Sequence, residues 1–267
     1  MMHGFIPPKR YFPYLTWKEI AEMPHKEDTV IIQPIGAIEQ HGHHLPIAVD
    51  SAISLGVLGK ALSQLDDTIP AYALPCLYYG KSNEHDGFPG TITLSADTLL
   101  SVIKEMAASI YNSGFRKLVL MNSHGGQPQI VEIAARDLHQ EHPDFNVFPF
   151  FTWRVPNIAG ELITKQELEY GIHAGDAETS IMLSLLPERV KMDLAVKEYP
   201  QLPQDSLLSM EGKLPFAWLT KEVSTTGVMG DATVANKEKG DRILASLADG
   251  WVEVIKDVYQ FQGLTTN

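Results

Sequence analysis

Short apolar runs alternate with amphipathic helical segments along most of this 267-residue chain, and the alternation limits the folds that it can adopt. Strands are expected where such runs lie between turn residues, and helices where apolar side chains recur every three or four positions. Alternating βα units predict an α/β fold whose mainly parallel sheet carries helices on both faces. The expected strands are 29–35, 72–77, 117–121 and 146–151, and the expected helices are 51–65, 99–111, 129–139, 179–186 and 243–255.

Composition indicates a single domain over residues 1–267. The chain is 44% hydrophobic, which is ample for a core, and no compositional break divides it. Residues 191–226 are less regular and could form a lid, an oligomer contact or plain connecting chain. Cys76 is the only cysteine, and its apolar neighbours predict a buried thiol rather than a nucleophile.

Charge and hydropathy exclude several kinds of partner. The formal charge of −12 argues against nucleic acid and against an acidic membrane, because both need a basic surface. No apolar stretch approaches the ~18 residues that cross a bilayer. Residues 1–17 are broken by prolines and lack the apolar block of a secretion signal. We expect a soluble, cytoplasmic protein without a nucleic-acid or membrane partner.

Residues 36–50 carry the ligand chemistry of a metal site directly after the expected strand 29–35. Imidazoles and carboxylates together suit zinc, manganese or iron. In an extended chain, side chains two residues apart point the same way, so Glu39 and His41 are expected in one pocket, with Gln40 facing elsewhere.

Further candidates follow other elements of the pattern. His124 comes after the strand 117–121, and His173 and Glu178 lie in a Gly-containing segment before a helix. Ligands of open parallel sheets bind at the carboxyl ends of the strands, so these segments are expected to converge with Glu39 and His41.

Each residue also has a plainer interpretation. A histidine beside a strand is often a surface or core residue, and Asp50 could cap a helix. Glu178 could be a carboxylate at a helix start, where the helix dipole favours negative charge. His173 could be a metal ligand rather than an acid–base group. His43 and His44 are expected beside the ligands or exposed rather than ligating.

Several motifs together resemble the creatininase (creatinine amidohydrolase) family. They are the Glu-x-His pair at 39–41, the aspartate at 50, Glu-His-Asp-Gly-Phe-Pro-Gly-Thr at 84–91, Asn-x-His-Gly-Gly at 122–126 and His-Ala-Gly-x-x-Glu-Thr-Ser at 173–180. Residues 227–240 resemble the C-terminal stretch of the family, so the resemblance covers nearly the whole chain.

The resemblance implies an α/β fold, a binuclear metal site, hydrolysis of non-peptide C–N bonds, and homo-oligomers that are often hexameric. Carried over by position, Glu39 and His124 would hold one ion, His41 would hold the other, and Asp50 would bridge them. The implied cofactors are two divalent metal ions, either zinc, manganese or iron.

Two positions depart from authentic creatininases. These carry a metal-binding glutamate where this chain has Gly126, and a glutamate where it has Ile172. The second ion therefore needs another carboxylate, for which Glu178 is the candidate. The pattern is more similar to other branches, which include a formamide deformylase and a protein of mycofactocin maturation, so creatinine is not the favoured substrate.

The predicted function is a metal-dependent amidohydrolase that cleaves a small amide, formamide or cyclic amide with a metal-activated water. His173 would move a proton from that water to the leaving nitrogen. His85, Tyr79 and Trp153 are candidates for substrate contact, although aromatic residues near strand ends are more often core. The alternative is a metal-binding maturation or scaffold protein without turnover. A nucleotide-binding enzyme comes third, because no phosphate-loop fingerprint is present.

Overall fold

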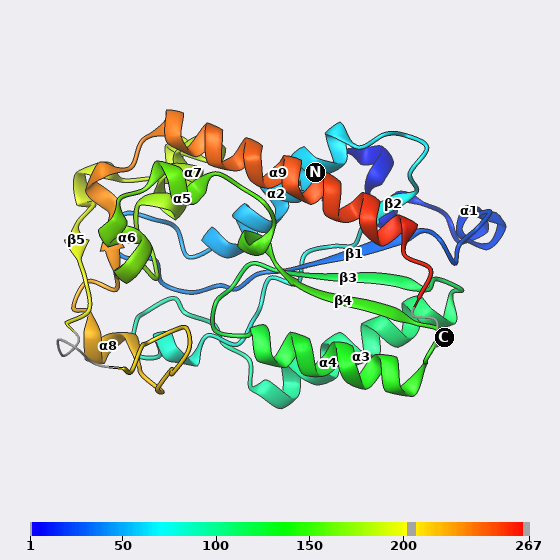
Figure 1. Cartoon of the computed structure of the whole chain (residues 1–267), viewed down its shortest axis with the longest axis horizontal. Coiled ribbons are helices and arrows are strands. Elements are labelled where there is room, and N and C mark those ends of the chain that lie inside the picture. Colours follow the sequence, from blue (N-terminus) through cyan, green and yellow to red (C-terminus); the bar gives the residue numbers. More distant parts are fainter. Residues whose placement is uncertain (1, 202–206, 264–267) are drawn as a thin grey trace.

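A parallel sheet of four strands, in the order β2-β1-β3-β4, forms the centre of the computed structural model, which describes residues 2–201 and 207–263 (Figure 1). β1 (Val30–Ile35) pairs with β2 (Ala71–Ala73) on one side and with β3 (Lys117–Asn122) on the other. β4 (Asn146–Phe151) pairs with the outer side of β3. All of these pairs are parallel, as the alternating sequence pattern predicts.

Helices cover both faces of this sheet. On one face lie α2 (Val49–Gln64), α7 (Asp176–Leu185) and the long α9 (Lys237–Gln260), which pack against one another. On the other face lie α3 (Ala96–Asn112) and α4 (Pro128–Glu141) (Figure 1). The predicted α/β class with helices on both faces is therefore confirmed.

Short elements complete the described part of the chain. β5 (Lys197–Glu198) pairs antiparallel with β6 (Gly230–Asp231). The short α-helices are α1 (Trp17–Glu22), α5 (Ala159–Leu162), α6 (Lys165–Tyr170) and α8 (Thr220–Val223). The 3-10 helices are η1 (Pro8–Arg10), η2 (Phe12–Tyr14), η3 (Asn83–His85), η4 (Thr152–Arg154), η5 (Pro187–Arg189), η6 (Met192–Leu194) and η7 (Ala232–Val234). The irregular segment 191–226 lies partly outside the described residues.

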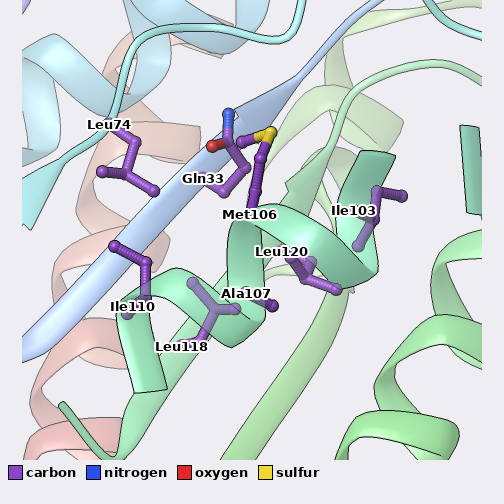
Figure 2. A pocket seen from close by; sticks show the side chains of 8 residues that line it. All are labelled: Gln33, Leu74, Ile103, Met106, Ala107, Ile110, Leu118 and Leu120. Atoms are coloured by element: carbon purple, nitrogen blue, oxygen red, sulfur yellow. The ribbon is translucent and has the colours of Figure 1, made fainter. Parts of the chain in front are cut away.

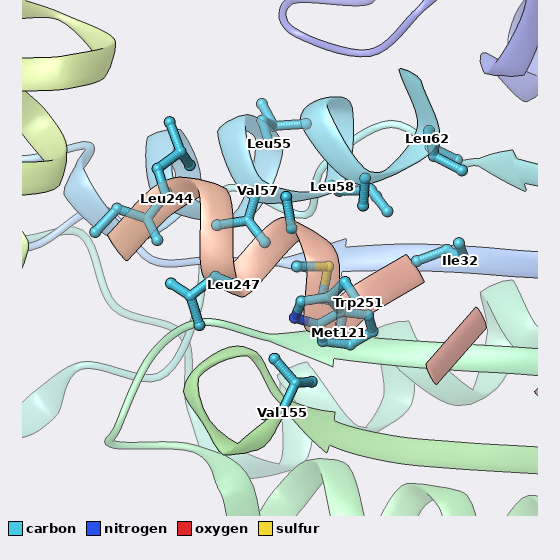
Figure 3. Packing of buried hydrophobic residues seen from close by; sticks show 14 of the residues in the cluster. Ile32, Leu55, Val57, Leu58, Leu62, Met121, Val155, Leu244, Leu247 and Trp251 are labelled. Atoms are coloured by element: carbon cyan, nitrogen blue, oxygen red, sulfur yellow. The ribbon is translucent and has the colours of Figure 1, made fainter. Parts of the chain in front are cut away.

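Alternation along the strands divides the core into two apolar clusters. Val119 and Met121 of β3 face α2 and α9, whereas Leu118 and Leu120 face α3 and α4. The first cluster centres on the fully buried Trp251 of α9, packed between α2 and the sheet (Figure 3). Helix layers on both faces thus fix the sheet whose carboxyl edge carries the candidate site.

A small cavity lies between α3 and the sheet (Figure 2). Its wall is apolar apart from Gln33, whose Nε2 donates hydrogen bonds to the backbone oxygens of Pro34 and Pro75, both at 2.8 Å. Gln33 Oε1 has no hydrogen-bond partner within the described chain. Because the rest of the wall is apolar, the void is a gap in core packing.

Some element boundaries differ from the expected ones. The strand expected at 72–77 ends at Ala73, because Pro75 has no N–H to continue the ladder. α2 begins two residues before the predicted start and α7 three residues before it, which brings Asp50 and Glu178 into their first turns. No helix among the described residues combines the length and apolar character needed to cross a membrane.

Candidate metal centre

All five predicted metal ligands meet at the carboxyl edge of the sheet. Glu39 and His41 follow β1, His124 follows β3, Asp50 lies in the first turn of α2, and Glu178 lies in the first turn of α7. Four of them are buried to 3% exposure or less, while the Glu178 side chain remains 18% exposed. The cluster is therefore closed on most sides and most accessible at Glu178.

Asp50 lies between the two histidines of the cluster. Its Oδ1 is 3.8 Å from His41 Nε2, and its Oδ2 is 3.6 Å from His124 Nδ1. The side chain makes no capping bond at the start of α2, where Ala48 is the N-cap residue. The two oxygens of one carboxylate thus face two different imidazoles, which is the arrangement of a bridging ligand.

The other two carboxylates lie against the same histidines, Glu39 against both and Glu178 against His41. Glu39 Oε2 is 3.2 Å from His124 Nδ1, and Glu39 Oε1 is 3.9 Å from His41 Nε2. Glu178 Oε1 is 4.0 Å from His41 Nε2, while its Oε2 accepts a hydrogen bond from the Ala174 N–H at 2.6 Å. One half of the cluster is built on His124 and the other on His41.

Backbone hydrogen bonds fix which nitrogen of each histidine faces the cluster. His41 Nδ1 lies 3.1 Å from the carbonyl oxygen of Glu39, so it carries the proton and Nε2 offers a lone pair inward. His124 Nε2 lies 3.0 Å from the carbonyl oxygen of Lys81, which leaves Nδ1 as the inward atom. Such contacts behind an imidazole are typical of metal-ligating histidines.

Local turns hold these histidines in place. Gly42 adopts φ +68°, a left-handed conformation that glycine favours, and its N–H donates to Gln40 Oε1 at 2.9 Å. After β3, Asn122 closes its turn, since its Oδ1 accepts from the His124 N–H at 3.1 Å and its Nδ2 donates to the His124 oxygen at 2.9 Å. Asn122 therefore closes the turn that carries His124.

His173 lies against the cluster with one nitrogen occupied. Its Nε2 donates to the carbonyl oxygen of Gln40 at 2.7 Å, and its Nδ1 lies 3.8 Å from Glu39 Oε1. Its ring lies between those of His41 and His85, with centroid distances of 4.1 and 4.2 Å. Nδ1 is therefore the atom that can accept a proton or bind an ion.

Gln40 is a site residue that sequence reasoning missed. The prediction that it faces elsewhere is wrong, because its Nε2 lies 2.9 Å from His85 Nδ1 and 3.0 Å from the Gly227 oxygen, beside the ring of His173. Glu39 and His41 share one pocket as the alternation predicts, but His85 and His173 also lie against the Gln40 side chain. No local pattern signals this, because both histidine partners are distant in sequence.

The three predicted substrate contacts lie in different surroundings. His85 is buried, and its Nε2 is 3.4 Å from Glu39 Oε1. Trp153 packs partly buried against the apolar cluster around Trp251, and Tyr79 is 49% exposed. In the described chain no hydrogen bond, ion pair or ring contact joins Trp153 or Tyr79 to the predicted ligands, so their substrate role stays a prediction.

Burial opposes the ionisation of all three carboxylates. Burial raises the pKa of Asp50 well above its ordinary value, and the charge of Glu39 adds to the rise. Burial also raises the pKa of Glu178. Burial opposes ionisation of Glu39 as well, but His124 and then His85 outweigh it and hold the pKa of Glu39 well below its usual range. Additional positive charge would stabilise all three carboxylates in the ionised form.

The residues fit divalent ions. Glu39 Oε2, His41 Nε2 and Asp50 Oδ2 are buried and form no aligned hydrogen bond within the described chain. Ligands at about 2.0–2.2 Å from a tetrahedral zinc lie roughly 3.3–3.6 Å from each other. The inward atoms are 3.2–4.0 Å apart, close to that spacing. Their unmet polar capacity is what a metal ion would satisfy.

These features define an α/β protein with a buried cluster of metal-ligand side chains at the carboxyl edge of a parallel sheet. The profile of the creatininase family, described as creatinine amidohydrolase, matches residues 13–255. The chain therefore belongs to the creatininase family, as the motifs predict. It is an amidohydrolase of this family, whose members include hydrolases of amide and peptide substrates.

Individual relatives cover nearly the whole chain. Creatinine amidohydrolase of Pseudomonas putida is 31% identical over 261 residues, which cover 92% of this chain and 95% of that protein. Mycofactocin precursor peptide peptidase of Mycobacterium ulcerans (strain Agy99) is 32% identical over 249 residues, covering 88% and 87%. Identities of 31% and 32% do not separate the branches, so the branch remains a proposal.

Solved creatininases share the fold. A mutant creatininase described as the Zn-Zn type superposes with a TM-score of 0.76 at 28% identity, covering 94% of this chain and 98% of that one. A creatininase structure described as the Mn form gives a TM-score of 0.70 at 26% identity, covering 94% and 99%. Structural neighbours of this chain thus include zinc and manganese forms.

Proposed function

We propose that this chain is a binuclear-metal amidohydrolase that cleaves a non-peptide C–N bond of a small amide, formamide or cyclic amide. The observation that carries the proposal is the position of Asp50, whose two oxygens face His41 and His124 separately. Glu39 and His124 would hold one ion, and His41 and Glu178 the other, with Asp50 shared. Zinc, manganese and iron all suit this mixed nitrogen and oxygen set.

The chain's own residues would supply orientation and proton transfer. Two bound divalent ions supply Lewis acidity toward a carbonyl oxygen and lower the pKa of a water molecule. His173 would take a proton at Nδ1 and deliver it to the leaving nitrogen, since Nε2 is held by the carbonyl oxygen of Gln40. The ring contacts with His41 and His85 keep that nitrogen directed at the cluster.

The substrate is proposed to differ from creatinine. Gly126 and Ile172 stand where authentic creatininases carry glutamates, which supports a branch that acts on linear formamides or small amides. A second candidate is the C–N bond of a short peptide, favoured by the 32% identical mycofactocin precursor peptide peptidase.

A homo-oligomer is also proposed. It rests on the resemblance to a family whose homo-oligomers are often hexameric.

Turnover assays on purified, chelator-treated and re-metallated protein test the proposal. Protein loaded with zinc or manganese should hydrolyse a formamidopyrimidine-type compound or a small amide better than creatinine. Creatinine turnover as efficient as the best alternative would refute the branch, and preferred cleavage of a short peptide would select the second candidate. Two bound ions without turnover of any amide would instead support a metal-binding maturation or scaffold role.

A further inference from the structure

Glu84 is a partly buried carboxylate that the proposed metal set does not use. It lies on η3 beside His124, and its side chain is 13% exposed. Its Oε1 is 3.0 Å from His124 Nε2, yet the two groups are not aligned for a hydrogen bond, so their interaction is electrostatic. Its Oε2 lies 3.6 Å from Lys81 Nζ, which ties the carboxylate to the same loop.

Gly126 provides the space that Glu84 occupies. A Cβ atom at position 126 would lie 1.7 Å from Glu84 Oε1 and 2.6 Å from His124 Nε2. No side chain can be added there unless the carboxylate moves, because real Cβ atoms essentially never approach other atoms so closely. The position of Glu84 therefore depends on glycine at 126.

The contacts of His124 Nε2 determine which of the two ring nitrogens carries the proton. Besides Glu84 Oε1, this nitrogen lies 3.0 Å from the Lys81 carbonyl oxygen and 3.3 Å from Ser82 Oγ. A carbonyl oxygen can only accept, so Nε2 must carry the proton. A carboxylate charge beside that N–H stabilises this tautomer and makes the opposite nitrogen, Nδ1, a better electron donor.

We propose that Glu84 is a positioning residue for the metal centre, which acts through His124 by holding the proton on Nε2 and presenting Nδ1 to an ion. The inference rests on the proposed metal function and adds a residue to it. It assigns Glu84 to only one half of the cluster, that of Glu39 and His124, because Glu84 pairs with His124 and makes no ion pair with His41 among the described residues.

The test is zinc titration of chelator-treated full-length protein, with binding measured calorimetrically and zinc counted by elemental analysis. Glu84→Gln keeps the shape of the side chain and removes its charge. It should lower the affinity for one of two zinc ions by about 10–100-fold, the usual effect of losing a hydrogen-bonding or charged partner behind a metal ligand. The other ion and the melting temperature of the metal-free protein should not change. Glu132→Gln, in a partly exposed ion pair with Arg154 at 4.0 Å, is the matched control.

A double-mutant cycle adds a second, independent arm. Gly126→Ala should weaken binding of the same ion. Its effect should be smaller when Glu84 has already been replaced by alanine, because only the close contact of the new Cβ with His124 Nε2, at 2.6 Å, then remains. Full additivity of the two substitutions, or unchanged affinity for both ions in Glu84→Gln, would overturn the proposal. An equal loss of both ions with a lower melting temperature of the metal-free protein would make Glu84 merely structural. Wild-type protein that binds no zinc would refute the metal function itself.

Discussion

Two buried carboxylate clusters of this protein, one around Glu167 and one around Glu39 and Asp50, differ in how their oxygens are satisfied. Glu167 Oε1 accepts from the Asp176 N–H at 2.8 Å, and Oε2 accepts from the Asp231 N–H at 2.9 Å and from the Tyr199 hydroxyl at 2.7 Å. Glu39 Oε2 and Asp50 Oδ2, equally buried, have no aligned donor in the described chain.

The difference indicates that the Glu167 cluster supports the fold and that the cluster of Glu39 and Asp50 serves metal binding. Glu167 is complete without a ligand and joins α6, the start of α7 and β6, which frames the turn that carries His173. The cluster of Glu39 and Asp50 is incomplete, and a protein retains such unsatisfied charge where another species neutralises it. The comparison predicts that substitutions in the first cluster affect folding and those in the second affect metal binding.

The largest effect is expected from removing the bridge. Asp50→Ala should lose both ions and, with them, turnover, whereas Glu39→Ala should mainly weaken one ion. Elemental analysis of chelator-treated, re-metallated protein measures this, with the exposed Asp86→Ala from the η3 loop as control. Two ions retained in Asp50→Ala would eliminate the bridge.

Removing His173 should affect catalysis without affecting the ions. His173→Ala is expected to keep both metals and the fold while turnover falls by about 10²–10⁴-fold, the usual contribution of a positioned acid–base group. Metal content and turnover are measured on one preparation, beside the exposed neighbour variant His43→Ala. Loss of an ion would make His173 a ligand, and unchanged turnover would remove it from the mechanism.

Glu167→Ala tests the satisfied cluster. It leaves three buried or partly buried donors without an acceptor, so the free energy of unfolding should fall by about 2–4 kcal/mol. Denaturant unfolding should give the same loss with and without chelator, and the exposed Glu169→Ala on α6 should have little effect. A loss that occurs only in the presence of metal would contradict the division between the two clusters.

Glu198 offers a smaller effect at the protein surface. Burial opposes its ionisation, but hydrogen bonds from Thr225 and Thr226 and from the Ser224 hydroxyl lower its pKa to about 2. A lowered pKa stabilises the fold above the ordinary carboxyl value, and this stability is lost as pH falls through the range from about 4.3 toward 2.

Glu198→Gln should therefore reduce stability at pH 7 and flatten the decline between pH 4 and pH 2. Thermal unfolding at a series of pH values checks this against the exposed Glu188→Gln. A variant with the same acid-side slope as wild type would show that these hydrogen bonds do not favour the charged form.

Much of the fold and of the ligand set could be predicted because the signals are local. Periodicity located β4 at Asn146–Phe151 to the residue, and the rule that parallel strands share a carboxyl edge brought His124 beside Glu39. The roles of Gln40 and Glu84 at the site could not be predicted from such local signals. Their partners lie far along the chain, His173 for Gln40 and His124 for Glu84, and only the folded loops place them together.

Anomalous scattering from crystals of the zinc-loaded protein tests the central claim most directly. We predict two zinc peaks at the carboxyl edge of the sheet, one between Glu39 and His124 and the other between His41 and Glu178, with Asp50 touching both. A single peak, peaks away from these residues, or no peak at all would contradict a binuclear centre bridged by Asp50.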